Sequence, residues 1–242
     1  ESWNTDFCEV ELKIIDNGPG SRASISGTIA TASGEGVSNA TVTMDAPVIE
    51  YPKSVNTDIN GNYVTNDNPL TLNYTVNASK GGDYVNGVTT LDIVIIQRHI
   101  LGMESLNDNY KVIAADANND SRVTAQDLSE LRKLILGVTT KFANESWRFP
   151  VTGAVVNTNP IAFTEGIQIN GLSGDVFGQN FVAVKIGDVN GSVDLSAKGS
   201  SVEARSNDKV SLSIAEANVA AGELITIPVT ASNFVNVSGF QY

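Results

Sequence analysis

Apolar residues in the first third of the chain recur at every second position, in short runs separated by turn residues. The runs at 23–30, 40–44 and 73–78 show this alternation, and Asn60-Gly61 within 57–64 is typical of a hairpin turn. Alternation of this kind predicts strands with one buried face. The number and spacing of the runs between residues 21 and 80 predict a β-sandwich of about seven short strands.

Between residues 88 and 137 the apolar period becomes that of a helix, and the pattern occurs twice. Residues 88–102 and 123–137 match at an offset of 35, with Val, Thr, Asp, Ile, Leu and Gly at equivalent positions. The shared apolar positions follow the i, i+3, i+7, i+8 spacing of one helix face. Each repeat ends in glycine, a frequent helix stop. We therefore expect two amphipathic helices that pack as a pseudo-symmetric pair.

The remainder of the chain again favours strands. Within 138–195, the segments 146–150 and 181–186 are typical of strands, and the Gly-rich and Asn-Pro turns between them argue against helices. A small, polar linker precedes apolar runs at 210–214, 224–229 and 237–242. The predicted fold class is multidomain and mainly β: an Ig-like β-sandwich, a loop–helix pair and further strands.

Composition and charge exclude several function classes. The net charge of −12 argues against a nucleic-acid or anionic-membrane partner, and no apolar run is long enough to span a bilayer. One His and one Cys leave little material for zinc sites or nucleophilic triads. Few aromatic and charged residues and 21 glycines are typical of a β-rich extracellular chain. We expect no enzyme.

Twelve residues directly before the second predicted helix carry oxygen atoms at EF-hand-type spacing. Positions 1, 3, 5, 7, 9 and 12 are Asp116, Asn118, Asp120, Arg122 (through its carbonyl), Thr124 and Asp127. Ca²⁺ prefers six to eight oxygen ligands, which a loop of this length can supply. The alternative is a polar turn with Asp127 as a first-turn acid, but five side chains at fixed spacing favour calcium. Asp at position 12 and Ser121 at position 6 distinguish this loop from an ordinary EF-hand.

The first repeat has only the closing half of such a loop. Counting back from Asp92 places Thr89 at position 9, but positions 1 and 5 are Gly81 and Val85, without side-chain oxygens. Either hydrogen bonds hold this loop without calcium, or ligands arrive from elsewhere. Residues 188–191, Asp-Val-Asn-Gly, have the pattern of an opening half with no helix after it. We hypothesise a split site in which Asp188 and Asn190 complete Thr89 and Asp92; the alternative is a surface turn.

The loop–helix pair resembles a type I dockerin, whose units end in Asp and occur in pairs, over residues 81–137. The resemblance implies calcium held by Asp116, Asn118, Asp120 and Asp127, with Thr124 acting through water. It also implies a cohesin domain on another chain as partner. The exposed helix residues that would then contact the partner are Arg98, His99, Arg132 and Lys133.

The flanking segments carry resemblances of their own. Residues 25–29, 36–42 and 57–63 resemble the carboxypeptidase-regulatory-like (collagen-adhesin B-type) sandwich, residues 6–18 resemble the last strand of a hyalin-repeat Ig-like domain, and residues 221–229 resemble the start of a cohesin. The expected division is 1–19, end of a preceding Ig-like domain; 20–80, sandwich; 81–195, extended dockerin-like module; 196–208, linker; 209–242, truncated start of a cohesin-like domain. Both chain ends look cut. Cys8 is either buried or half of a disulfide with an upstream partner.

Two functions fit this organisation. A dockerin-like unit in mid-chain, followed by cohesin-like strands, favours a non-catalytic, calcium-stabilised structural or adhesive segment. Its setting would be a large secreted bacterial surface or filament protein, in contact with other domains or like subunits. The alternative is a scaffold-docking module that binds a cohesin on another chain. The two differ in whether the helix pair is free or covered by residues 138–195.

Overall fold

The computed structural model describes residues 22–195, 211–214, 226 and 228–232. The predictions for Cys8, the preceding Ig-like domain, the linker and the run at 237–242 lie outside these residues. The contacts divide the chain into two units. The described part of unit 1 comprises residues 22–80, 148–156 and 163–184, and unit 2 begins at Gly81 and comprises residues 81–147, 157–162 and those from 185 onward.

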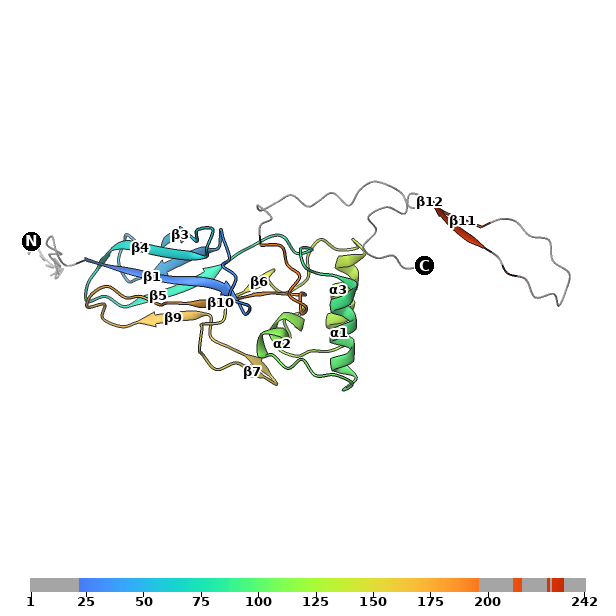
Figure 1. Ribbon diagram of the computed structural model, residues 1–242. Helices are drawn as coiled ribbons and strands as arrows, with labels where there is room; N and C mark the ends of the chain where they lie inside the picture. Colours follow the sequence, from blue (N-terminus) through green and yellow to red (C-terminus); the bar gives the residue numbers. More distant parts are fainter. Residues whose placement is uncertain (1–21, 196–210, 215–225, 227, 233–242) are drawn as a thin grey trace, which may run out of the picture. The chain divides into compact units, whose positions relative to one another are not determined.

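Unit 1 is built on two four-stranded sheets (Figure 1). The first has the order β4 (Asn62–Pro69), β1 (Arg22–Thr31), β10 (Phe181–Lys185) and β6 (Trp147–Arg148). The second has the order β3 (Lys53–Asn56), β2 (Thr41–Asp45), β5 (Tyr74–Ser79) and β9 (Gly166–Ile169). β1 pairs antiparallel with β4 and parallel with β10, with Ile29 opposite Phe181. Both sheets are therefore completed by strands from far downstream.

The core of unit 1 lies where the alternating apolar residues of both sheets meet. Ile25 and Ile29 of β1 and Met44 of β2 are fully buried. The Thr65 hydroxyl of β4 donates to the Met44 sulfur at 3.2 Å, which brings the buried faces of the two sheets into contact. Fully buried apolar side chains stabilise by about 1.5–3 kcal/mol each relative to exposure, so this alternation is sufficient to fix which face of each strand points inward.

The predicted strands of residues 21–80 form, but the sheets draw on more of the chain. Five strands lie between Arg22 and Ser79, against about seven expected, and β3 was not among the predicted runs. β9 and β10 fill the remaining places by pairing with β5 and β1. The sequence-based division assigned these residues to the segment 81–195, whereas the contacts assign 163–184 to unit 1. Strand pairing over this distance leaves no local signal in the sequence.

Unit 2 contains the three helices of the described residues, α1 (Thr90–Ile100), α2 (Asn109–Ala115) and α3 (Ala125–Ile135), and a short hairpin, β7 (Asn157–Thr158) and β8 (Ile161–Ala162). α1 and α3 occur at the predicted offset of 35 and pack against one another. Ile96 and Leu131, at equivalent positions, are both fully buried. The prediction of a pseudo-symmetric helix pair is confirmed, while α2 was not predicted.

Both helices of the pair begin and end in the same way. Each has a Thr N-cap and a capping box closed by Asp three residues later, which satisfies two otherwise free backbone N–H groups. Each ends at Leu followed by a glycine in the left-handed region, Gly102 with φ 67° and Gly137 with φ 70°. None of the helices described is long and apolar enough to cross a membrane.

A separate two-stranded ladder lies near the end of the chain. β11 (Ser211–Ile214) pairs antiparallel with β12 (Val229–Ser232). The first of these matches the apolar run at 210–214. The second begins where the predicted strand 224–229 was to end, and Thr226 and Pro228 are not in a strand. The cohesin-like assignment of residues 209–242 stays a prediction.

Candidate metal centre

The twelve-residue loop of unit 2 is held between two helices. Asp116 is the residue at which α2 ends, and its N–H donates to the Ile113 carbonyl at 3.2 Å. Thr124 is the N-cap of α3, and Asp127 lies in the first turn of that helix. The first and last acidic positions of the loop are therefore fixed by rigid elements, with exposed fractions of only 5% for Asp116 and 0% for Asp127.

Backbone N–H groups surround the Asp116 carboxylate. Its Oδ1 accepts from the Asp120 N–H at 3.1 Å and its Oδ2 accepts from the Ser121 N–H at 3.0 Å. Ser121 has a φ of 66°, in the left-handed region where EF-hand loops place glycine. The chain thus turns sharply at position 6 without glycine, and this turn wraps the loop around its first carboxylate.

Asp127 closes the loop from the other side. Its Oδ1 accepts from the Asn118 N–H at 3.1 Å, and its Oδ2 accepts from the Thr124 N–H at 2.7 Å and the Thr124 hydroxyl at 3.3 Å. Asn118 also donates from its amide to Asp120 at 2.9 Å. Positions 1, 3, 5, 9 and 12 are therefore linked in one hydrogen-bonded network. Arg122, at position 7, takes part through its N–H, which donates to Asp120 Oδ1 at 3.0 Å.

The network concentrates negative charge in a poorly solvated place. Burial, together with the neighbouring Asp127 carboxylate, raises the pKa of the Asp116 carboxyl to about 6. Burial also raises the pKa of Asp127, against the lowering effect of the Thr124 and Asn118 hydrogen bonds. A cation between these groups would remove both penalties, because an opposite charge favours the ionised form. Carboxylate, amide, hydroxyl and carbonyl oxygens together form a donor set that suits Ca²⁺.

Two contacts that the sequence did not indicate brace this loop within unit 2. Asn144, buried to 3% exposure, donates from its side chain to the Asp116 carbonyl at 2.6 Å and from its backbone to the Ala117 carbonyl at 3.1 Å. The Ile161 N–H in β8 donates to the Ser121 carbonyl at 2.8 Å. Both depend on the fold placing a distant backbone or amide group beside the loop, so no local pattern could have revealed them.

The structure brings together the four residues of the hypothesised split site, all within unit 2. The Thr89 N–H and hydroxyl donate to Asp92 Oδ2 at 2.8 and 2.7 Å. The Asn190 N–H donates to Asp92 Oδ1 at 3.1 Å, and the Asn190 amide lies 3.5 Å from the Thr89 hydroxyl. Asp188 is 8% exposed and accepts from three backbone N–H groups downstream of it.

The four predicted partner-contacting residues lie on the outer side of the helix pair. Arg98, Arg132 and Lys133 are exposed and His99 is half-buried. Arg98 pairs with Glu104 at 3.0 Å and Lys133 pairs with Glu130 at 2.8 Å, both on the surface. The His99 Nδ1 accepts from the Leu106 N–H at 3.2 Å, so this ring helps to fix the turn after α1.

Among the described residues, no three His, Cys, Asp or Glu side chains form a cluster that could hold a metal by themselves. This finding does not exclude an EF-hand-type loop, which uses amide, hydroxyl and main-chain oxygens beside its carboxylates.

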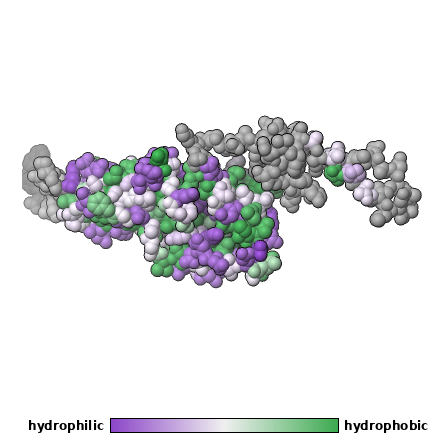
Figure 2. Space-filling model, viewed as in Figure 1, coloured by the Kyte–Doolittle hydropathy of each residue, from purple (hydrophilic) through white to green (hydrophobic). Residues whose placement is uncertain are grey.

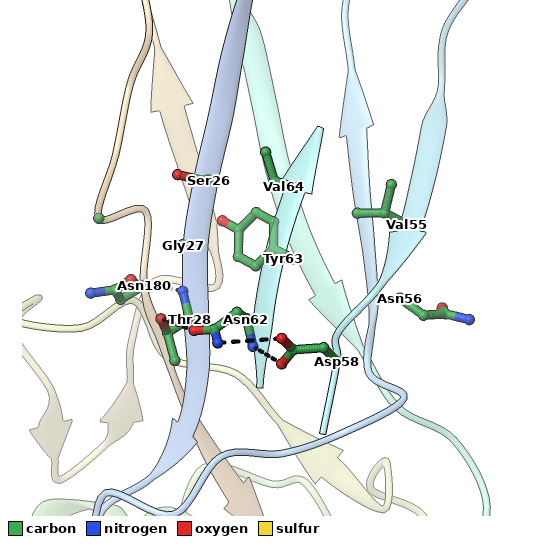
Figure 3. Close-up of a pocket in the computed structure, with 11 residues that line it drawn as sticks. Ser26, Gly27, Thr28, Val55, Asn56, Asp58, Asn62, Tyr63, Val64 and Asn180 are labelled. Carbon is green, nitrogen blue, oxygen red and sulfur yellow. Dashed lines mark hydrogen bonds between the residues drawn. The ribbon is translucent and has the colours of Figure 1, made fainter. Parts of the chain in front are cut away.

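A hollow in unit 1 is lined by residues of β1, β3 and β4 (Figure 3). Its one carboxylate, Asp58, accepts from the Asn60 and Asn62 N–H groups at 2.9 and 2.8 Å. The hydrogen bond from the Asn62 N–H lowers the pKa of Asp58. The ionised carboxylate is thus already engaged by backbone N–H groups. Asp58 is the one acidic side chain that lines this hollow, whereas glycoside hydrolysis needs a pair of acids.

The comparisons with known proteins identify one part of the chain. No curated protein and no solved structure gives a significant match. Residues 85–136 match the family model of the dockerin type I domain. This segment contains α1, α2, α3 and the whole loop from Asp116 to Asp127, so the dockerin resemblance is confirmed over these residues and not for the flanking strands.

Proposed function

We propose that the described part of unit 2 is a calcium-dependent docking module, which binds a cohesin-type domain of another chain outside the cell. The observation that carries this proposal is the hydrogen-bonded network of oxygen-bearing residues from Asp116 to Asp127, which leads directly into α3. Dockerin domains bind calcium and dock onto cohesin domains, and the match to that family covers this loop.

Calcium has a structural part in this proposal. The loop ties the end of α2 to the start of α3 through the buried residues Asp116 and Asp127. Without a cation, these carboxylates repel one another in a poorly solvated place. We expect calcium binding to supply part of the folding free energy, since the unfolded chain has no such site. Extracellular calcium concentrations suit EF-hand-type modules of modest affinity.

The docking surface that we propose is the exposed stripe on α1. Leu91, Val94 and Leu101 are exposed to 55, 50 and 62%, and with Arg98 they recur at helical spacing on one side of α1. Figure 2 shows hydrophobic residues gathered over the part of unit 2 that the helices occupy. Exposed apolar patches rimmed by polar groups are typical of protein interfaces.

The two helices differ at two of these four positions, which favours α1 over α3 as the docking helix. Residues 126 and 129, at the offset of 35 from Leu91 and Val94, are Gln and Ser, whereas Lys133 and Leu136 match Arg98 and Leu101 in character. Half of the Val94 surface is exposed, so residues 138–195 do not cover this position of α1. Residues 189 and 190 donate to Asp92 and so cover one end of α1, but Leu91 and Val94 stay exposed, which supports docking through this face.

Titration calorimetry with recombinant type I cohesin domains tests the proposal on the whole chain. We expect binding in calcium and none after chelation with EGTA or in Asp116→Ala. Val94→Glu should weaken binding at least about tenfold, the effect of losing one interface anchor. Ile59→Glu, at a still more exposed apolar position in unit 1, is the matched control and should leave binding unchanged. Binding that persists in EGTA, or that ignores Val94→Glu, would contradict the proposal.

A second function, the calcium-stabilised structural or adhesive segment, is favoured by one observation. The chain leaves unit 1 after residue 80 and returns to it at residue 148, so the matched dockerin segment is an insertion and not a terminal tag. An inserted module transmits force between its two chain connections. Single-molecule unfolding should then require a higher force in calcium than in EGTA, and equal forces would argue against this role.

A further inference from the structure

We propose that residues 188–193 and 87–92 form a second calcium site, assembled from two chain segments about a hundred residues apart. This site lies within unit 2 but mostly outside its dockerin match, since residues 188–193 follow the matched segment. It goes beyond the proposed docking function and does not depend on a cohesin partner. Asp188, Asn190 and Ser192 take positions 1, 3 and 5 of a loop that Gly87, Thr89 and Asp92 continue at positions 7, 9 and 12.

The closing acid of the split loop makes the same contacts as that of the continuous loop. The Asn190 N–H donates to Asp92 Oδ1 at 3.1 Å. The equivalent bond, from Asn118 to Asp127 Oδ1, is also 3.1 Å. In both loops the second carboxylate oxygen accepts from the backbone N–H of the Thr N-cap three residues earlier, at 2.8 and 2.7 Å.

The opening acid repeats its pattern too. Asp188 Oδ1 accepts from the Ser192 N–H, four residues on, at 3.1 Å, and its Oδ2 accepts from the Val193 N–H, five residues on, at 2.8 Å. In the continuous loop, Asp116 accepts from the residues four and five positions on, at 3.1 and 3.0 Å. Two chain segments far apart in the sequence therefore reproduce the main hydrogen bonds of the opening and closing acids, although the chain breaks after position 6. Two further bonds, from the Val189 N–H to Asp92 and from the Gly191 N–H to Asp188, are added in the split loop.

One atom in the split loop indicates a missing ligand. The Asn190 Oδ1 is buried and has no hydrogen-bond partner among the described residues. A buried polar oxygen without a partner costs about 1–3 kcal/mol. Position 3 of an EF-hand-type loop is a calcium ligand, so an ion at the centre of the loop satisfies this oxygen. The hydroxyl of Ser192 and the carbonyl of Gly87, 3.1 Å apart, supply positions 5 and 7.

The neighbourhood is built to hold the two segments together. Asn86 and Asp194 exchange two hydrogen bonds, at 2.9 and 3.0 Å. The buried Lys185, the last residue of β10, donates to the Tyr84 carbonyl at 3.2 Å. Gly187 donates from its N–H to the Ala114 carbonyl at 2.7 Å. These contacts bring Asp188 to Asp92 before any ion binds, which lowers the entropic cost of assembling the site.

The carboxylate count predicts how the two sites differ. The split site has two, Asp188 and Asp92, whereas the continuous loop has three. Calcium affinity in such loops rises with the number of charged ligands, so the split site is the weaker of the two. Asn190→Asp restores a third carboxylate at position 3 and should tighten this site about tenfold.

Calcium titration calorimetry on the whole chain tests the inference. We expect two ions for the parent protein, one for Asp188→Asn and one for Asp116→Asn, with the tighter ion lost only in the latter. Asp45→Asn, at an exposed carboxylate of β2, is the matched control and should retain two ions. Circular dichroism establishes that each variant is folded. Asn190→Asp keeps the inference testable if Asp188→Asn fails to fold, since it should raise the affinity of the weaker site alone.

Amide hydrogen exchange locates the second ion. Calcium should slow exchange at Asn190, Ser192 and Val193 in the parent protein, and Asp188→Asn should abolish this protection while leaving that of residues 118–121 intact. A single ion in the parent, lost in Asp116→Asn, would overturn the split site and leave the docking function standing. A second ion that survives Asp188→Asn and ignores Asn190→Asp would also overturn it. No ion at all would contradict both.

Discussion

Gly87 lies where the two segments of the split loop meet, and replacing it with alanine should force them apart. Its φ is 77°, and a Cβ built there would lie 2.8 Å from Asp188 Oδ2 and 2.8 Å from the Val193 Cα. The second of these atoms belongs to the backbone, so it cannot move without displacing residues 188–193. We expect Gly87→Ala to weaken unit 2 and to disturb the split site.

The magnitude has two parts. A non-glycine residue in the left-handed region costs about 1–2 kcal/mol, and overpacking costs about 1–3 kcal/mol more. Gly191→Ala isolates the first part, because Gly191 has a φ of 76° in the same unit but nothing lies within 4 Å of its added Cβ. In a unit of this size, the melting temperature falls by about 4–8 °C for each kcal/mol of stability lost. A steric collision that costs about 2 kcal/mol should therefore separate the melting temperatures of the two variants by roughly 8–16 °C.

Differential scanning calorimetry in EGTA is the assay, because chelation separates the packing effect from ion binding. The transition of unit 2 should melt lowest in Gly87→Ala, with Gly191→Ala between this variant and the parent. Equal melting temperatures for the two variants would refute the reasoning, since only the collision with residues 188–193 distinguishes them. Calcium titration of the same proteins should show the weaker ion lost in Gly87→Ala.

Three further predictions concern calcium removal, the helix pair and the core of unit 1. At a free calcium concentration of about 1,000 times the dissociation constant, bound calcium should add about 4 kcal/mol to the free energy of unfolding of unit 2, and EGTA should remove this gain and lower the melting temperature. A melting temperature that EGTA does not change would argue against a structural ion. Leu131→Ala, at a fully buried position of α3, should lower the free energy of unfolding by about 2–5 kcal/mol in urea titrations. The control Leu136→Ala, at a residue directly after α3 that is 64% exposed, should change this free energy by less than about 0.5 kcal/mol. Asn68→Ala should destabilise unit 1 by about 2–4 kcal/mol, because the buried amide donates to the Ala23 carbonyl at 3.0 Å and accepts from the Tyr51 hydroxyl at 2.9 Å; a loss below 1 kcal/mol, measured by the same titration, would mean that water replaces these bonds.

Local patterns in the sequence predicted the local features of this protein. The helix pair followed from the repeat at an offset of 35, and the loop from Asp116 to Asp127 followed from oxygen spacing, because both are determined within a dozen residues. The juxtaposition of Asp188 with Asp92 was also foreseen, since each half of the split loop retained a recognisable fragment of the pattern. That inference required the incomplete motif at residues 188–191 and the incomplete motif that ends at Asp92 to be combined into a single loop.

Contacts between distant segments were not predictable in the same way. β9 alternates apolar and polar residues and β10 is a continuous apolar run up to Lys185, and nothing in the composition of either strand identifies β5 or β1 as its partner. Asn144 and the Ile161 N–H brace the calcium loop through groups that every asparagine or peptide possesses. Such pairings are selected by the global packing of the chain, which outweighs local preference.

The parallel pairing of β1 with β10 has a consequence for how the protein is made. Ile29 lies opposite Phe181, and a ribosome that adds about 5–20 residues per second needs roughly 8–30 s to synthesise the residues between them. During that interval one edge of β1 has no partner, and an open edge is a template for pairing with the wrong chain. The helix pair, whose contacts are local, can form in the meantime. Residues 181–193 then complete both units in a single stretch of synthesis, so a nascent chain halted before them would expose two unfinished surfaces at once.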